Sequence, residues 1–181
     1  MKFKMNTDLY NLANWFSKNK LTLNISKSKF MIFGHSARTS SFSTLSLTVC
    51  AKKLDRVESF KYLGVPFDQR LSWEEHIVNI ATKVKKRIGI LNRIKYLLPR
   101  HERIIYYNSM IKPILEYNGI IWGDKGNTVL METLQVLQNK AANTIFNRDL
   151  HSSATQALVD LNCVSLYKRR TIDRCFLFTN V

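Results

Sequence analysis

The sequence predicts an α+β fold, in which a small antiparallel sheet with one helix is followed by an all-helical bundle. Its 181 residues are 45% hydrophobic and 23% charged, which is typical of a folded globular protein. Short apolar runs broken by Ser, Thr, Gly and Asn lie before residue 70, and long segments with a 3.6-residue apolar period follow it. We therefore expect three parts: residues 1–70 with the sheet, residues 71–148 as the helical bundle, and residues 149–181 as a helical C-terminal extension.

The part before residue 70 combines one helix with short strands. Apolar residues at helical spacing predict a helix that begins near Thr7 and ends near Lys20. Strands are predicted over residues 21–24, 30–33, 46–50 and 60–67, and a loop over residues 35–44. The run 30–33 is apolar without alternation, so we expect this strand to be covered on both faces. Gly64 indicates a bulge or a close backbone approach, and Pro66 indicates a sheet edge.

The part after residue 70 follows a helical pattern. Ser72 and Glu75 have the spacing of a capping box, which predicts the start of a long helix that ends before Pro99. A second helix is predicted over residues 100–117, bent at Pro113 because proline lacks a backbone N–H. A connection over residues 119–126 carries Trp122. Three further helices are indicated by an apolar stripe (Leu130, Leu134, Leu137, Ala141, Ile145), by Ser153 and Gln156 in capping-box spacing, and by a last stripe (Leu166, Ile172, Phe176).

The charge balance favours a polyanionic partner. Lys and Arg number 28 against 13 Asp and Glu, which gives a formal net charge of +15. Counterion release favours phosphate binding by such a chain, so nucleic acid is the first partner to consider and an anionic membrane surface the second. A basic protein without any polyanionic partner remains the alternative.

The cysteines and the apolar runs indicate a soluble intracellular protein. Cys50, Cys163 and Cys175 are odd in number and form no CxxC pair, which is typical of a reducing compartment. The N-terminus lacks the pattern of a signal peptide, and no run approaches the roughly 18 apolar residues of a membrane span. The expected location is intracellular, with the nucleus as one candidate compartment.

The acidic residues provide no recognisable catalytic centre. Two-metal phosphoryl transfer needs clustered carboxylates that hold two cations about 4 Å apart. No two aspartates of this chain are adjacent or closely clustered. Glu74 and Glu75 are adjacent, but they fall in the first turn of a predicted helix, where a negative charge suits the helix dipole. We therefore predict no catalytic residue and no metal ligand in this chain.

A cluster of cations marks a candidate nucleic-acid surface. Between residues 83 and 103 the predicted phosphate-binding side chains are Lys83, Lys86, Arg87, Arg93 and Lys95, with Arg103 also in the cluster. Tyr96, Tyr106 and Tyr107 are interleaved with them and are candidates for stacking on bases or sugars. The alternative is a solvated helix face with the tyrosines in the core.

Three motifs, in their order along the chain, resemble one family. Residues 12–33 read LANWFSKNKLTLNISKSKFMIF, similar to the W-x-x-x-N-K-L helix and the following L-N-x-x-K-[TS]-x-x-M-x-F strand of non-LTR (LINE-type, jockey-like) retrotransposon reverse transcriptases. Residues 60–65 read FKYLGV, which resembles the primer-grip hairpin of that family. Leu71-Ser72-Trp73, Ile121-Trp122-Gly123 and Gln138-Asn139-Lys140-Ala141 resemble the thumb.

The resemblance implies a C-terminal piece of the polymerase. Residues 1–70 then correspond to the end of the palm, and the thumb begins near Trp73. Lys27 matches a motif lysine proposed to assist pyrophosphate departure. The primer-grip residues are Phe60, Lys61, Tyr62, Leu63 and Gly64. The family's metal-binding aspartates lie upstream of the matched helix, so Mg²⁺ is expected only for the full-length polymerase and no cofactor for this chain.

The resemblance also implies an RNA/DNA template–primer duplex as partner, with the oligomeric state open and no membrane partner. Three interpretations remain open at this point. The chain is a fragment of an RNA-directed DNA polymerase that is inactive alone, a helical module co-opted for binding nucleic acid or protein, or part of an active polymerase whose front half was lost in gene modelling.

Overall fold

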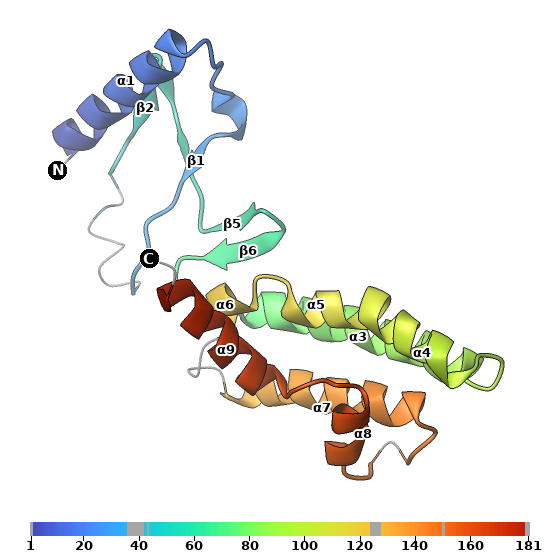
Figure 1. Cartoon of the computed structure of the whole chain (residues 1–181). Coiled ribbons are helices and arrows are strands. Elements are labelled where there is room, and N and C mark those ends of the chain that lie inside the picture. Colours follow the sequence, from blue (N-terminus) through green and yellow to red (C-terminus); the bar gives the residue numbers. More distant parts are fainter. Residues whose placement is uncertain (1, 36–41, 43, 124–127, 150, 180–181) are drawn as a thin grey trace. The chain divides into compact units, whose positions relative to one another are not determined.

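The computed structural model describes residues 2–35, 42, 44–123, 128–149 and 151–179. Much of the predicted loop 35–44 and part of the predicted connection 119–126 therefore lie outside the described residues. The chain forms two compact units, Met1–Leu71 and Ser72–Val181, each of which is described by itself (Figure 1). Strands occur only in the first unit and helices make up the second, so the predicted α+β class is confirmed among the described residues.

The first unit contains one long helix and three pairs of short strands. Its elements are α1 (Lys2–Lys18), a 3₁₀ turn (Ile25–Lys27), β1 (Lys29–Phe30), β2 (Thr48–Val49), β3 (Lys52–Lys53), β4 (Asp55–Arg56), β5 (Ser59–Tyr62) and β6 (Val65–Asp68). β1 pairs with β4 in parallel, whereas β2–β3 and β5–β6 are antiparallel. Leu47, Val49 and Leu54 form the buried centre, against which α1 packs through Met5 and Leu9.

Several expected strands of the first unit differ from the structure. Residues 21–24 form no strand, and the run 30–33 contributes only Phe30 to one. Phe33 is 54% exposed, so the prediction that this run is covered on both faces was wrong. Residues 60–67 belong to two strands joined by a turn at Leu63 and Gly64, with φ of 47° and 85°. Positive φ at both positions is the requirement of a tight hairpin turn, which explains Gly64 without a bulge.

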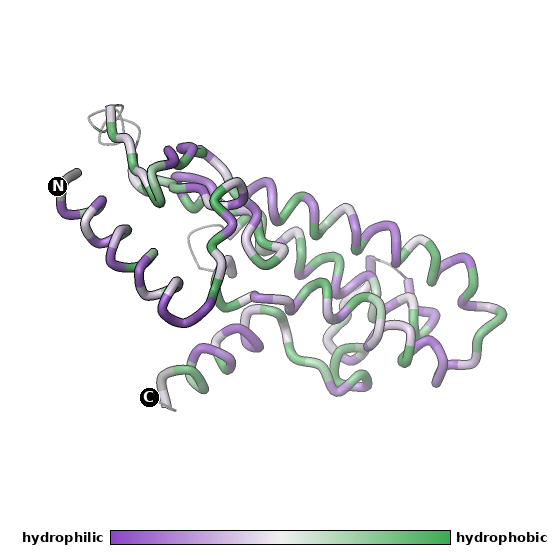
Figure 2. The backbone as a smooth tube through the Cα atoms, turned by 90° about the horizontal axis from the view of Figure 1, so that it is seen from above, coloured by the Kyte–Doolittle hydropathy of each residue, from purple (hydrophilic) through white to green (hydrophobic). Residues whose placement is uncertain are grey.

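The second unit is a bundle built around two long helices. Its elements are α3 (Glu74–Ile94), α4 (Arg100–Tyr106), a π-helical turn (Tyr107–Ile111), α5 (Lys112–Glu116), α6 (Gly119–Trp122), α7 (Thr128–Ile145), α8 (Thr155–Asp160) and α9 (Leu166–Thr179). α3 and α7 pack along each other. Hydrophilic and hydrophobic positions alternate along the helices, as an amphipathic pattern requires (Figure 2). α8 and α9 pack against α7, so the expected extension 149–181 lies in the same compact unit.

The helix ends and the bend differ in detail from the sequence pattern. Trp73 is the N-cap of α3 and Ala154 that of α8, each without a side-chain cap, so both helices begin one residue later than the capping boxes predicted. The predicted bend at Pro113 takes the form of the π-helical turn just before it, which widens the helix where proline cannot donate. Trp122 ends a short helix and is fully buried, whereas a connection was predicted there.

Candidate nucleic-acid interface

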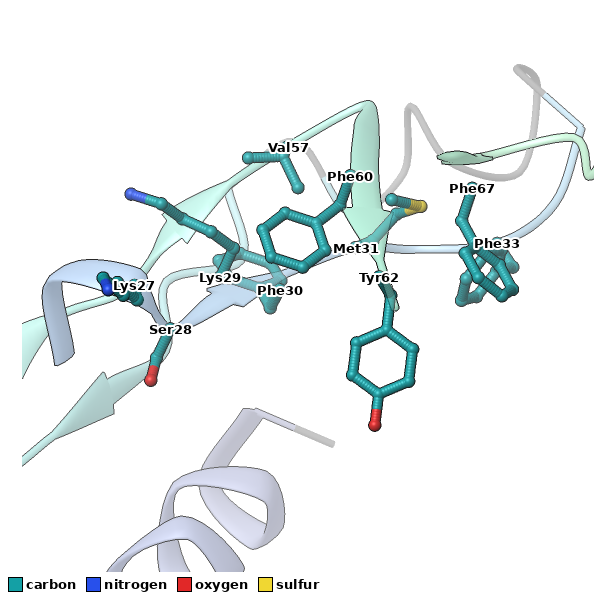
Figure 3. A pocket seen from close by; sticks show the side chains of 10 residues that line it. All are labelled: Lys27, Ser28, Lys29, Phe30, Met31, Phe33, Val57, Phe60, Tyr62 and Phe67. Atoms are coloured by element: carbon teal, nitrogen blue, oxygen red, sulfur yellow. The ribbon is translucent and has the colours of Figure 1, made fainter. Parts of the chain in front are cut away.

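One pocket of the first unit gathers residues from two separate motifs. It has a volume of about 480 Å³ and is lined by Lys27, Ser28, Lys29, Phe30, Met31, Phe33, Val57, Phe60, Tyr62 and Phe67 (Figure 3). The predicted motif lysine, Lys27, thus lines the same pocket as two predicted primer-grip residues, Phe60 and Tyr62. Cations lie at one end of the pocket and aromatic rings at the other, so it can accept a group that is partly anionic and partly flat and apolar.

The backbone of Lys27 is held in place by a capped 3₁₀ turn. Asn24 caps the 3₁₀ turn, and its Oδ1 accepts hydrogen bonds from the Ser26 hydroxyl at 2.7 Å and from the backbone N–H of Lys27 at 3.2 Å. Lys27 itself is exposed, and its ammonium forms no ion pair with a residue that the structure describes. The asparagine of the L-N-x-x-K motif therefore has a local structural role, which is to fix the turn that presents the lysine.

The neighbouring Lys29 is already engaged. Its Nζ lies 2.6 Å from Oδ2 of Asp55, and the two residues are partners in the parallel β1–β4 pair. The hydrogen bond and the charge of Lys29 lower the pKa of the Asp55 carboxyl from its usual value. Because Asp55 balances Lys29, the uncompensated positive charge at this end of the pocket belongs to Lys27.

The β5–β6 hairpin presents an aromatic face to the pocket. Phe60 pairs with Phe67, and Tyr62 pairs with Val65 beside the turn. Phe60 is 38% exposed and Tyr62 is 59% exposed, and the Tyr62 and Phe67 rings meet edge to face with centroids 6.5 Å apart. Lys61 lies between them in the strand, so its side chain points to the opposite face. Leu63 and Gly64 form the turn.

The predicted cations of α3 divide into exposed and engaged side chains. Lys83, Lys86 and Arg93 are exposed on one side of α3, while the apolar stripe that includes Val84 and Leu91 is buried on another. Arg87 is half-buried and its Nη1 lies 3.4 Å from Sδ of Met110. Three exposed cations about one to two turns apart therefore form a row along α3, which we call the basic row.

Other members of the predicted cluster have structural roles. Arg103 is buried, and its guanidinium donates a 2.9 Å hydrogen bond to Oδ1 of Asn147, so the expectation that it faces nucleic acid was wrong. Tyr107 is fully buried, and burial raises the pKa of its hydroxyl. The Tyr106 hydroxyl donates to the backbone carbonyl of Arg87 at 3.2 Å. Of the three interleaved tyrosines, only Tyr96 is exposed. Sequence periodicity could have assigned Tyr107 to the core.

The described residues do not fit a two-metal centre. No group of three or more His, Cys, Asp or Glu side chains among them could hold a metal ion. Lys27 and the hairpin offer groups for binding, and no step of metal-assisted chemistry can be derived from this part of the chain. Within the described residues, no helix has the length and apolar character needed to cross a membrane.

Sequence comparisons support the resemblance seen in the motifs. In an alignment of 157 positions that covers 78% of this chain, it is 25% identical to the probable RNA-directed DNA polymerase from transposon X-element of Drosophila melanogaster. In an alignment of 158 positions that covers 85% of this chain, it is 28% identical to the probable RNA-directed DNA polymerase from transposon BS of the same organism. No protein-family profile and no solved structure matches the chain.

The chain is much shorter than these relatives. The matched stretches make up 16% and 17% of the two Drosophila proteins, so the chain spans about one sixth of their length. The similarity nevertheless extends over most of this sequence, including both compact units. The resemblance predicted from the motifs is thus confirmed, and this chain is similar to a region of RNA-directed DNA polymerases from two Drosophila transposons.

Proposed function

We propose that the chain supplies template–primer binding to a non-LTR retrotransposon RNA-directed DNA polymerase. In this proposal, residues 1–70 are the end of the palm with the primer-grip hairpin, residues 71–148 are the thumb, and residues 149–181 are an extension of the thumb. The observation that carries it is the basic row: Lys83, Lys86 and Arg93 project from the exposed side of one long helix whose opposite side is buried. A rigid helix with regularly spaced cations suits contact with successive phosphates.

The pocket of the first unit supports a second contact in the same proposal. Lys27 provides a cation, and Phe60 with Tyr62, which the motif resemblance assigns to the primer grip, provides aromatic faces. Aromatic side chains stack on bases with little dependence on sequence, and phosphate contacts carry no sequence information either. The proposed binding is therefore independent of nucleic-acid sequence. An A-form-like RNA–DNA hybrid is the expected ligand, with Mg²⁺ needed only by the full-length polymerase.

A salt series tests the basic row. Binding of the chain to a fluorescent RNA–DNA hybrid should weaken steeply as salt rises, because bound phosphates release counterions. The variant Lys83→Ala/Lys86→Ala/Arg93→Ala should bind more weakly, with a log–log salt slope shallower by about 2 to 3 units, at roughly 0.9 per lost phosphate contact.

The matched control is Lys52→Ala/Lys53→Ala/Lys168→Ala, which removes the same charge from exposed positions that do not belong to α3. It should leave most of the slope unchanged. Equal effects of the two variants would show that net charge alone attracts the duplex. A folded wild-type chain that does not bind at low salt would refute the proposal and favour a module co-opted for binding protein.

A further inference from the structure

The turn between α3 and α4 is a fixed, hydrogen-bonded tip. The carbonyl oxygen of Ile94 accepts the backbone N–H of Leu97 at 2.9 Å and that of Leu98 at 3.2 Å. Pro99 is the N-cap residue of α4, and its carbonyl oxygen accepts the N–H of Arg103 at 3.3 Å. Two helices converge on this turn at one end of the helical unit (Figure 1). The residues between them therefore form an ordered, hydrogen-bonded turn.

This tip carries two apolar side chains that the helical unit leaves uncovered. Tyr96 is 78% exposed and Leu97 is 81% exposed, the highest values among the large hydrophobic residues described. We call this pair the apolar tip. Transfer of such side chains from water into an apolar contact is favourable, and an ordered turn has already lost much of the entropy that docking would otherwise remove.

Cations surround the apolar tip on the α3 side. Nζ of Lys95 lies 5.0 Å from the centroid of the Tyr96 ring, and the exposed Arg93 precedes it on the last turn of α3. Arg100, on the other side of the turn, is directed elsewhere, because its guanidinium stacks on Phe146 at 4.2 Å. The same helix carries Lys83 and Lys86. An aromatic and an aliphatic group next to positive charges complement a partner that combines flat apolar faces with phosphates, which is the chemistry of a nucleic acid.

We propose that Tyr96 and Leu97 act as a wedge that enters a groove of the bound duplex and partly unstacks one base step. The basic row would hold the phosphate backbone, while Lys95 neutralises a phosphate beside the inserted ring. This inference rests on the proposed nucleic-acid function and names the residues that would distort the duplex. Apolar wedges flanked by cations are a recurring means of unstacking bases from the groove side.

The test uses RNA–DNA hybrids that carry the fluorescent base 2-aminopurine at successive positions. Unstacking raises the fluorescence of this base, so the wild-type chain should brighten it at some positions. The variant Tyr96→Ser/Leu97→Ser should lose this signal and bind roughly ten-fold more weakly, with an unchanged salt slope, because it loses stacking rather than phosphate contacts. Tyr96→Phe should retain both the signal and the affinity.

The matched control is Val129→Ser/Val159→Ser, which removes apolar groups that are 76% and 64% exposed on α7 and α8. It should behave as the wild type. If the tip variant binds and brightens the probe as the wild type does, the wedge is refuted while the basic row stands. Wild-type binding without brightening at any position also refutes the wedge alone. No wild-type binding refutes both proposals.

Discussion

At the residue scale, Arg170 is a cation that composition would assign to the surface and the structure places in the core. Its guanidinium carbon lies 4.7 Å from the centroid of the Trp122 ring, and Nη1 lies 2.8 Å from Sδ of Met131. Burial, and then the charge of Arg174, lower the pKa of Arg170 to about 10. The side chain remains charged at neutral pH, so part of the net charge counted from the sequence is unavailable to a ligand.

The space for Arg170 is created by two glycines, Gly119 at the start of α6 and Gly123 at its C-cap. A Cβ on Gly123 would lie 2.4 Å from Cδ of Arg170 and 2.3 Å from the backbone oxygen of Gly119. Gly123→Ala should therefore lower the free energy of unfolding by about 1 to 3 kcal/mol, as over-packing of a core does. Urea unfolding measures this change.

Gly89 is the matched control for Gly123, because a Cβ there meets nothing within 4 Å. Gly89 lies inside α3, so Gly89→Ala should stabilise the chain by about 1 kcal/mol through helix propensity alone. A stabilising effect of both substitutions would show that Arg170 is not packed against α6.

His76 should make the stability of the chain depend on pH. Burial, and then the charge of Lys83, lower the pKa of His76 below its ordinary value, and its ring meets Trp122 edge to face at 5.2 Å. The unfolded chain therefore binds the proton more readily than the folded chain. As pH falls through about 6.5, the unfolded state gains protons first and stability is lost.

The urea midpoint of the wild type should accordingly fall between pH 7.5 and 5.5, and His76→Gln should reduce this decrease. His101→Gln, at an exposed position, should leave the decrease unchanged. An identical pH dependence in the His76 variant would assign the effect to another group.

At the scale of elements, long amphipathic helices were predictable and short strands were not. The stripe Leu134, Leu137, Ala141 and Ile145 is buried in α7 as predicted, because a long helix repeats its signal over several turns. Phe176, which was predicted as the third residue of the last stripe, is 64% exposed, whereas Leu166 at the start of α9 is buried. Strands of two residues, such as Lys52–Lys53, contain too few positions to show any period.

The candidate site was predictable in its parts but not in its grouping. The motifs indicated Lys27 and the hairpin separately, and only the folded unit brings Lys27, Phe60 and Tyr62 to one pocket. The cation cluster was recognised as a set, but helical geometry divides it between solvent and core. Lys83 and Arg93 face solvent, whereas Arg103 is buried and bonded to Asn147. Contacts between distant segments decide these differences, and no local pattern encodes them.

At the scale of the whole molecule, each compact unit has its own buried core. Trp122, Tyr107 and Leu134 are fully buried side chains of the unit Ser72–Val181, and the basic row lies in the same unit.

Residues 72–181 expressed alone should therefore unfold cooperatively and retain most of the affinity for an RNA–DNA hybrid, with a salt slope close to that of the full chain. Far-UV circular dichroism and the salt series measure the two properties. The matched fragment 1–71 should bind more weakly, because its core is small and it lacks the basic row. If the fragment 1–71 instead retained the binding and 72–181 lost it, the main contact would be the pocket of Lys27, Phe60 and Tyr62, and the basic row would be a solvated helix face.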